Sequence, residues 1–339
     1  MLSCLNRISI IRYLIVWRVN SSLAYIPGYL SLELSRVIGS IIAQRLPSSE
    51  KTAWKKTLDP LIKYLDNLAK TQKRKREPIP DVAWPINSTL LVYPGKRTCG
   101  KDELIFWELK LLGEHADHGL FLEVILPAME EASFTSDPRW NKKNRLWGHF
   151  DILHVYAARG NSWEPIVHDG KLDLRYRATP FQWCEQLKFK PTSGYHFSRL
   201  NWMSPFDLVD VVANLSKFEF SNKHLTLLIN NAPTLPLILL SLIFRIEELL
   251  HARSKIPDHV GEFLSEEDRT TFHQALETVS RISIDKNNIR QAPFNWPGRY
   301  FGVQQFKGIP RSIIPYLELA SILHIGKQTH FGCGTFVIA

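Results

Sequence analysis

Cysteine is scarce in this chain, and no two cysteines lie close together. Only four occur among 339 residues, and they form no CxxC pair: Cys4, Cys99, Cys184 and Cys333. A zinc ribbon or a dithiol redox centre needs such pairs, so we expect neither, and we expect reduced thiols in a cytosol. Carboxylates also lack metal-binding spacing. We therefore expect no metal, no other cofactor and a cytoplasmic location.

Long apolar runs are absent as well. The most apolar stretch, Leu235 to Phe244, is shorter than the roughly 20 residues that a membrane-spanning helix needs, and Arg245 ends it. Apolar residues near the start are interrupted by arginines, and no small-residue cleavage site follows them. These patterns predict a buried helix at 235–244, no secretory signal and no membrane partner.

The chain does have an excess of positive charge and enough apolar residues for a core. Lys and Arg together number 42 against 33 Asp and Glu, which gives a formal net charge of +9. That excess favours a polyanion or an acidic surface as partner. Hydrophobic residues make up 45% of the sequence, and 339 residues are enough for two domains of ordinary size.

The first half alternates between strand and helix signals. Ile8 to Val19 is rich in β-branched and aromatic residues, and a helical period begins at Tyr29. The polar face of this helix holds Tyr29, Glu33, Arg36 and Ser40. Further strands are predicted at Thr89 to Tyr93, Glu103 to Leu112 and Leu146 to Ala157, and a further helix at Ala116 to Glu131. A strand followed by a helix at the start suits a ferredoxin-like domain.

A basic segment interrupts this first half. Lys51 to Arg76 holds nine basic and two acidic residues, and Pro78 and Pro80 follow it. The pattern predicts a helix that ends in a basic loop, as an insertion at about 48–80. Two interpretations stay open for it, a solvated helix face and a contact with RNA.

Glycine, asparagine and serine cluster near residues 158–170, which predicts a domain boundary. We therefore expect one domain at 1–160 and another at 170–339. The second domain is predicted to begin with a strand at Leu172 to Thr179. Its predicted helices are Pro205 to Leu215, Pro236 to Arg253, Phe263 to Val279 and Ile314 to Ile325. Both halves thus open with a strand and carry a helix soon after, without any repeat at the level of identity.

The last residues form the most specific pattern. The segment His324-Ile-Gly-Lys-Gln-Thr-His-Phe-Gly-Cys-Gly334 runs from the final helix into a terminal β-branched and aromatic strand. Glycine allows positive φ and close approach of another chain, and successive amides in such a loop suit a phosphate. Lys327 adds a point charge. The loop lacks Gly-x4-Gly-Lys-Ser/Thr and no helix follows it, so it does not match a nucleoside-triphosphate loop.

This ending resembles the C-terminal signature of the CRISPR-associated endoribonuclease family that processes precursor CRISPR RNA, a branch of the RAMP superfamily. Cys333 stands where that family usually has leucine. The segment Trp296-Pro-Gly-Arg-Tyr300 is similar to the family's Trp and Arg-Tyr-Ser segment, with Phe301 in place of the serine. Weaker similarities cover Phe106 to Gly113, Leu172 to Pro180 and Ile238 to His251.

The resemblance implies an α+β fold of two tandem ferredoxin-like (RRM-like, RAMP) domains with a C-terminal glycine-rich loop at 326–334. It implies that the partner is CRISPR repeat RNA or precursor CRISPR RNA, with other CRISPR-associated effector subunits as further candidate partners. A homodimer is left open. The implied reaction is one metal-independent cut, in which the ribose 2′-OH attacks the adjacent phosphate and leaves a 2′,3′-cyclic phosphate and a 5′-OH.

Such a cut needs a proton acceptor near the 2′-OH, a proton donor near the 5′ oxygen and positive charge at the phosphate. The family's usual base is a histidine near the first helix, but no histidine precedes His115. Tyr29 and Arg36 are the local substitutes, and His330 in the glycine loop is the third catalytic candidate. Each has a structural alternative: a lid on the core for Tyr29, a surface or phosphate contact for Arg36, and a solvent-facing strand edge for His330.

The predicted RNA-binding residues fall in three places. They are Gly326, Lys327, Thr329, Gly332 and Gly334 in the loop, Lys188, Lys190, His196 and Arg199 in a basic stretch, and Arg299 upstream of the final helix. In the basic stretch, Tyr and Phe beside positive charges can stack bases while the charges hold phosphates. An exposed loop of mixed composition is the plain alternative there.

Two other functions stay open. A RAMP-fold subunit could grip repeat or guide RNA without cutting it, as the missing early histidine would allow. An unrelated basic scaffold could use the glycine loop as a plain tight turn. In that case repeat RNA would bind no better than random RNA at moderate salt.

Overall fold

The computed structural model describes residues 3–70, 79–135, 145–189, 196–215, 228–229, 231–250 and 264–339. The chain divides into two compact units. We call Ser9–Leu187 the N-terminal unit. The C-terminal unit joins Lys188–Ala339 to the opening segment Met1–Ile8. The division thus lies at residues 187–188 rather than at the expected 160–170.

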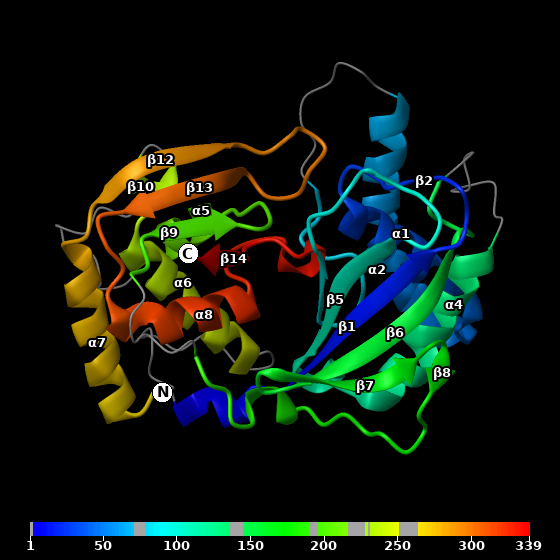
Figure 1. Ribbon diagram of the computed structural model, residues 1–339, viewed down its shortest axis with the longest axis horizontal. Helices are drawn as coiled ribbons and strands as arrows, with labels where there is room; N and C mark the ends of the chain where they lie inside the picture. The colour runs from blue at the N-terminus through cyan, green and yellow to red at the C-terminus, as the bar shows by residue number, and fades with distance from the viewer. Residues whose placement is uncertain are drawn as a thin grey trace. The chain divides into compact units, whose positions relative to one another are not determined.

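The N-terminal unit is built on a six-stranded antiparallel sheet in the order β3-β5-β1-β6-β7-β8 (Figure 1). Its strands are β1 (Ile10–Val19), β3 (Ser88–Val92), β5 (Leu104–Leu112), β6 (Phe150–Arg159), β7 (Ser162–His168) and β8 (Lys171–Leu172). Its helices are α1 (Leu30–Arg45), α2 (Ser48–Lys70) and a continuous helical segment made of α3 (His118–Leu120), η3 (Phe121–Ile125) and α4 (Leu126–Phe134). A separate short ribbon pairs β2 (Ala24–Tyr25) with β4 (Thr98–Cys99).

The sequence of these elements is strand, helices, two strands, helix, strand. This is the split βαβ arrangement of a ferredoxin-like fold, in which β1 lies between β5 and β6. The helical period predicted from Tyr29 is confirmed: Tyr29 is the N-cap of α1, and the polar positions Glu33 and Arg36 stay partly exposed. The predicted strands at 8–19, 89–93 and 103–112 are confirmed as β1, β3 and β5.

Tryptophan dominates the core of this unit. Trp17 on β1 stacks on Phe150 with ring centroids 4.0 Å apart, and Trp107 and Trp147 meet it edge-on. All four side chains are fully buried. Burying each large apolar side chain contributes roughly 1.5–3 kcal/mol to stability. Through Trp17, β1 therefore packs with β5, β6 and the α4–β6 connection in one core.

The glycine cluster near 158–170 forms hairpin turns, not a domain boundary. Gly160 has φ 53°, and a Cβ on it would lie 2.1 Å from the carbonyl oxygen of Glu185. Asp169 and Gly170 both have positive φ and connect β7 to β8. The predicted boundary fails because these turns extend the same sheet by two strands.

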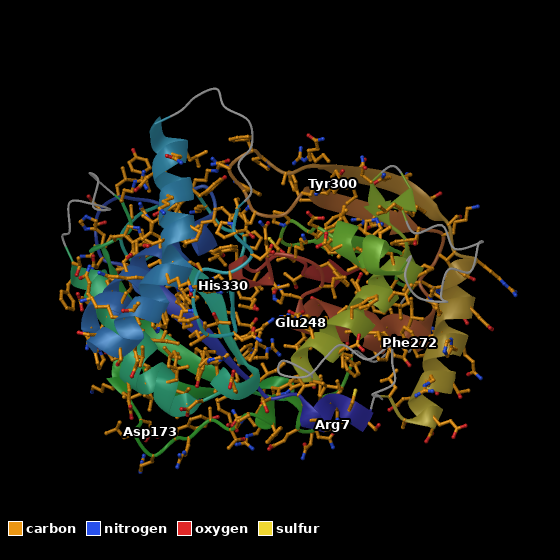
Figure 2. All side chains as sticks on the ribbon, turned by 180° about the vertical axis from the view of Figure 1, so that it is seen from behind. Arg7, Asp173, Glu248, Phe272, Tyr300 and His330 are labelled. Atoms are coloured by element: carbon orange, nitrogen blue, oxygen red, sulfur yellow. The ribbon has the colours of Figure 1, made fainter. Side chains whose placement is uncertain are left out.

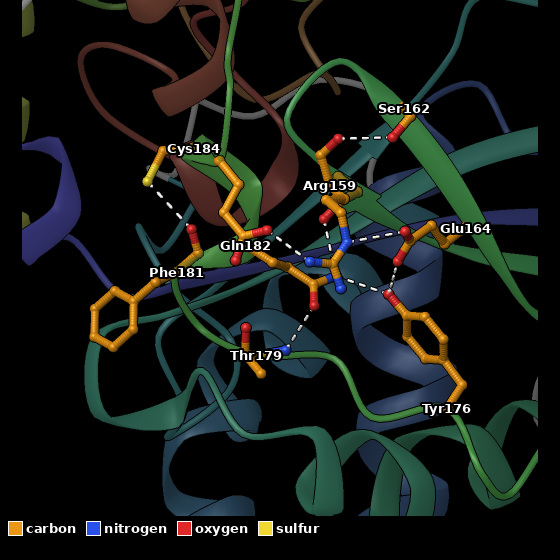
Figure 3. A network of polar contacts seen from close by, with 10 residues as sticks. Arg159, Ser162, Glu164, Tyr176, Thr179, Phe181, Gln182 and Cys184 are labelled. Carbon is orange, nitrogen blue, oxygen red and sulfur yellow. Dashed lines mark hydrogen bonds and ion pairs between the residues drawn. The ribbon is translucent and has the colours of Figure 1, made fainter.

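The predicted strand at Leu172 to Thr179 is also wrong beyond Leu172, where β8 ends. A polar network fixes the following segment instead (Figure 3). Arg159 lies 2.9 Å from Glu164 and 2.6 Å from Glu185, and Tyr176 donates to Glu164 at 2.7 Å. The buried Gln182 donates to Tyr176 and to the carbonyl of Ala158. Side-chain hydrogen bonds and ion pairs, and not the hydrogen bonds of a β-strand, therefore hold the segment after β8 in place.

The C-terminal unit repeats the same topology. Its four-stranded antiparallel sheet has the order β12-β13-β9-β14, with β9 (Arg199–Trp202), β12 (Ile284–Gln291), β13 (Tyr300–Phe306) and β14 (Phe336–Ile338). Its helices are α5 (Val209–Leu215), α6 (Leu235–Leu250), α7 (Glu266–Ser280) and α8 (Ile314–Leu323). A short hairpin pairs β10 (Leu228–Ile229) with β11 (Ala232–Pro233). Short helical turns are η1 (Ser3–Arg7), η2 (Gly113–His115), η4 (Gln182–Cys184), η5 (Arg311–Ile313) and η6 (Thr329–Phe331).

One face of the C-terminal sheet is its core. Trp202, Phe306 and Phe336 are buried on it. The buried Gln304 accepts a hydrogen bond from the Trp202 ring at 2.9 Å and donates to the carbonyl of Pro233 at 2.8 Å, so both polar groups are satisfied. The predicted helices at 236–253, 263–279 and 314–325 correspond to α6, α7 and α8, with 251–263 outside the described residues. The helix predicted at 205–215 begins only at Val209, since Phe206 forms a β-bridge with Tyr300.

Candidate nucleic-acid interface

The glycine loop connects α8 to β14, the last strand of the C-terminal unit. Its backbone repeatedly takes positive φ: 58° at His324, 89° at Gly326, 58° at Gln328 and 83° at Gly334. A Cβ on Gly334 would lie 1.9 Å from the carbonyl oxygen of Ile325, so only glycine fits there. The loop is therefore folded tightly back on itself.

The amides of this loop are already hydrogen-bonded. Gly332 donates to Thr329 and Gly334 donates to Pro205, both at 2.9 Å, and the backbone of Lys327 donates to Asp207 at 2.9 Å. The predicted amide cradle for a phosphate is wrong at Gly332 and Gly334. The physical reason is that the loop enters the fold between a helix and a strand, where an unpaired amide would be costly.

His330 lies inside the fold and not at a strand edge facing solvent (Figure 2). Its side chain is only 2% exposed, and Phe331 and Cys333 beside it are fully buried. The structure therefore does not present this imidazole to a bound phosphate. Thr329 is half-buried and opens the short turn η6. Gly326 allows a close approach to Asp207, whose carbonyl oxygen would lie 2.4 Å from an added Cβ.

The loop does bring two predicted cations to one end of the sheet. The backbone amide of Gly298 donates to the side chain of Gln328, which joins the loop to the β12–β13 connection. Lys327 pairs with Asp210, and Arg299 lies 3.3 Å from Asp207. Both basic side chains are near half exposed, so these pairs are weak and a phosphate can compete for either cation.

The second face of the C-terminal sheet is open. We call it the C-terminal open face, and its residues are Arg199, Asn201, Lys286, Asn288, Arg290, Phe301, Val303, Gln305 and Val337. The cross-strand pairs Arg290 with Phe301, Lys286 with Gln305 and Arg199 with Gln305 place them side by side.

The charge on this face is uniformly positive. Arg199, Lys286 and Arg290 are exposed, and none of them forms an ion pair with any residue that the structure describes. The Arg290 guanidinium lies 4.5 Å over the ring of Phe301. Among the paired positions of the four described strands no residue on this face is acidic, and Asp285 sits at a bulge. The face offers cations, side-chain amides and an aromatic ring together.

The remaining predicted residues are less informative. Lys188 is exposed where the C-terminal unit begins, His196 is exposed just before β9, and Lys190 lies outside the described residues. Arg36 is paired with Glu33 at 2.5 Å, with both side chains about 15% exposed, and its Nε is buried without a partner among the described residues. The predicted catalytic set of Tyr29, Arg36 and His330 thus spans both units.

Most residues of the C-terminal open face were not predicted from the sequence. Lys286, Asn288 and Arg290 recur at every second residue, which is the period of a strand. The segment is mostly polar, and its two isoleucines, Ile284 and Ile289, do not alternate with polar residues, so the sequence did not indicate a strand there. Only Arg199 of the three cations was predicted.

The chain shares its fold with solved structures, although no protein-family model and no curated protein matches it. A structure described as a partial Cas6-RT-Cas1–Cas2 complex matches over 98% of this chain and 46% of its own, with a TM-score of 0.51 and 8% identity. A second, described as a Cas6-RT-Cas1–Cas2 complex, has the same score and identity over 98% of this chain and 29% of its own. This chain therefore spans less than half the length of these two chains.

A structure described as a Cas6 product complex matches over 97% of this chain and 100% of its own, with a TM-score of 0.42 and 14% identity. The likeness to the first two structures is one of fold. Together with the repeated split βαβ topology, it confirms the predicted α+β fold of ferredoxin-like domains.

The residues that the structure describes include neither a membrane-spanning helix nor a metal-binding cluster. No helix among them has both the length and the apolar character needed to cross a membrane. Likewise, no group of three or more His, Cys, Asp or Glu side chains in the described ranges is arranged to hold a metal ion.

Proposed function

We propose that this chain binds CRISPR repeat RNA and cuts precursor CRISPR RNA in the cytoplasm. The observation that carries the binding part is the C-terminal open face, with three exposed cations that lack ion-pair partners among the described residues and a cation-stacked phenylalanine. A four-stranded sheet of this topology with aromatic residues on its open face is the platform on which RRM domains stack bases. Cations beside the ring hold the phosphates between stacked bases.

The proposed partners follow from the fold neighbours. The solved structures that share this fold are described as Cas6-RT-Cas1–Cas2 complexes. Repeat RNA and other CRISPR-associated subunits are therefore the partners we propose, and a homodimer is a further arrangement to test.

The proposed reaction rests on the resemblance of the C-terminal residues and on the chemistry of RNA. The ribose 2′-OH attacks the adjacent phosphate, and the bond from phosphorus to the 5′ oxygen breaks. The products are a 2′,3′-cyclic phosphate and a 5′-OH. The reaction needs a base, an acid and positive charge, and no metal ion takes part.

Cleavage is tested with repeat RNA from the CRISPR array of the genome that encodes the chain. We expect a single cut with EDTA present, and no cut when the nucleotide before the scissile phosphate carries a 2′-deoxy ribose. Cleavage of that deoxy substrate would overturn the mechanism, because the nucleophile would then come from elsewhere.

Binding is tested with the triple substitution of Arg199, Lys286 and Arg290 to Gln. The matched control replaces Arg269, Arg281 and Arg311, three exposed arginines of the same unit outside this face, with the same loss of charge. Single-stranded nucleic acid loses affinity with salt at a slope of about −0.7 per phosphate contact, so the triple variant should flatten the slope by roughly 2. An equal change in the control would show that net charge, not this face, governs binding.

A second candidate is a RAMP-fold subunit that binds repeat or guide RNA and cuts nothing. Three observations favour it: His330 is buried, Arg36 is paired with Glu33, and the amides of Gly332 and Gly334 are occupied. This candidate predicts salt-resistant binding of repeat RNA over random RNA, with no product even at excess protein.

A further inference from the structure

One row of side chains crosses five strands on the second face of the N-terminal sheet. Phe106 on β5 is opposite Val16 on β1, and Val16 is opposite His154 on β6. His154 is opposite His168 on β7, and His168 is opposite Lys171 on β8. Directly opposite residues share a face of a sheet, so an exposed aromatic ring, two imidazoles and an ammonium group line up in this order.

The two histidines form a close pair. Their ring centroids are 4.9 Å apart with an interplanar angle of 31°. The side chain of His168 is 69% exposed and His154 is half-buried, so both rings are reachable from solvent.

Asp169 contacts both members of the pair. Its carboxylate lies 3.4 Å from Nε2 of His168, and its backbone N–H lies 3.4 Å from Nδ1 of His154. Asp169 holds φ at 48°, a left-handed conformation that turns β7 into β8. The carboxylate therefore lies within ion-pair distance of the His168 imidazole, and the backbone N–H of the same residue donates to Nδ1 of His154.

Two β-bulges flank His154. One lies in the pairing of β1 with β6, between Val16 and Trp17, and the other in the pairing of β6 with β7, between Val155 and Tyr156. Bulges re-aim side chains and are over-represented next to active sites. The bulge between β6 and β7 sets the register that puts His154 opposite His168, and the bulge between β1 and β6 sets the register that puts His154 opposite Val16.

We infer that His168 and His154 are the general base and the general acid of RNA cleavage, and that Lys171 contacts the scissile phosphate. The inference rests on the proposed function. The buried His330 and the ion-paired Arg36 are poorly placed to act as acid or base. His154 and His168, which lie outside the predicted catalytic set, take these two roles. The two rings lie close enough together to serve the two ends of one phosphodiester, one as the base and the other as the acid.

The step balances without a metal or a redox partner. Nδ1 of His168 takes the proton of the 2′-OH while the 2′ oxygen bonds to phosphorus. The bond from phosphorus to the 5′ oxygen breaks, and that oxygen takes the proton from the imidazolium of His154. The 2′,3′-cyclic phosphate and the 5′-OH leave. His168 then releases its proton to solvent, and His154 takes one up from solvent. Lys171 stabilises the charge on the pentavalent phosphate.

Other charged and titratable groups share this face. Arg18 pairs with Asp151 at 3.1 Å one row away, and Tyr156 lies next to His154 with ring centroids 5.7 Å apart. Farther along, Arg12 pairs with Glu108. Among the residues that the structure describes, Asp169 contacts both histidines and Lys171 lies opposite His168 on the neighbouring strand.

The test replaces each histidine singly, His154→Gln and His168→Gln, in the full chain with the repeat RNA described above. Removing either member should lower the cleavage rate roughly 100-fold or more and leave RNA affinity unchanged. The pH profile of wild-type cleavage should have two limbs. His168→Gln should lose the acidic limb, where the base must deprotonate, and His154→Gln the basic limb, where the acid must stay protonated. The control His273→Gln removes an exposed imidazole from α7 and should cleave as the wild type does.

A second measurement does not depend on turnover. The imidazole NMR signals of His154 and His168 should shift when repeat RNA blocked by a 2′-deoxy at the cut site is added, and the signal of His273 should not. Asp169→Asn should slow cleavage less than either histidine change, because it removes only the carboxylate beside the base.

The outcomes separate this inference from the proposed function. Wild-type rates and pH profiles in both histidine variants would overturn the inference while leaving cleavage in place. A wild-type chain that binds repeat RNA selectively but does not cut it would overturn the inference and support the binding subunit. Absence of selective binding would overturn both.

Discussion

The two units share one topology but use their charged residues in opposite ways. In the N-terminal unit, Arg12 Nε lies 2.6 Å from Glu108 Oε1, and Lys110 Nζ lies 3.9 Å from the same oxygen. These side chains are almost completely buried, and Tyr93 donates a further hydrogen bond to Glu108. In the C-terminal unit, the cations of the open face are exposed and have no acidic partner among the described residues.

This difference separates charged residues that stabilise the fold from charged residues that are available to a ligand. A buried carboxylate must be paired, because a charge out of water is costly, and Glu108 is held by two cations. Burial by itself raises the pKa of Glu108, but the charges of Arg12 and Lys110 and the hydrogen bonds from Arg12 and Tyr93 outweigh it and leave the pKa below its usual value. Exposed cations such as Arg290 contribute little to stability, and they remain available to a ligand.

The largest expected effect comes from breaking the buried cluster. Glu108→Ala leaves Arg12 and Lys110 buried without a counter-charge and should lower the free energy of unfolding by about 3–5 kcal/mol at neutral pH. A group whose folded pKa is depressed stabilises the protein above its unfolded pKa of about 4.3, and this contribution fades as pH falls through the folded value. Urea unfolding at several pH values therefore should show the gap between wild type and variant closing in acid.

The matched control is Arg290→Gln on the C-terminal open face, which should leave the unfolding midpoint unchanged. Equal destabilisation by both changes would remove the distinction between the two units.

The glycine loop allows a second contrast between the units. Gly334 and Gly113 both have positive φ, but an added Cβ on Gly334 would meet the Ile325 carbonyl at 1.9 Å, while nothing lies within 4 Å of one on Gly113. Gly334→Ala should cost about 2–5 kcal/mol, the sum of backbone strain and overcrowding, and Gly113→Ala about 1–2 kcal/mol from strain alone. Thermal unfolding measures both.

The same pair tests what the loop is for. If the loop is a structural closure, RNA affinity measured below the unfolding transition should be unaffected by Gly334→Ala. If the folded Gly334→Ala variant lost affinity for RNA, the loop would instead contact RNA directly.

Much of the fold could be predicted from local pattern. Three local patterns each indicate a buried face: the helical period of α1 from Tyr29, the apolar run of α6 and the β-branched residues of β1. The boundary near 160 could not be predicted in this way, because Gly160 and Gly170 are typical of a hairpin turn and of a linker alike. Only the pairing of β6 with β7 and β8 decides between them.

The candidate sites were harder to predict, because they depend on register and burial. Sequence spacing placed His330 in a loop, but the accessibility of its ring depends on how α8 and β14 meet. His154 and His168 lie opposite each other only because a bulge shifts the register of β6 and β7 by one residue, and sequence spacing does not reveal that shift. Glycines in the loop suggested free amides, whereas the fold uses those amides for its own closure.

The smallest expected effect concerns the aromatic ring of the C-terminal open face. Phe301→Leu keeps an apolar side chain under the Arg290 guanidinium but removes the π face on which a base can stack. One stacked base is worth about 1–3 kcal/mol, so repeat RNA should bind roughly 5-fold or more weakly, while the salt slope stays that of the wild type because no phosphate contact is lost. Phe134→Leu, an exposed phenylalanine on α4 of the N-terminal unit, is the control. A Phe301 variant that changes the salt slope instead would mean that the ring positions Arg290 rather than a base.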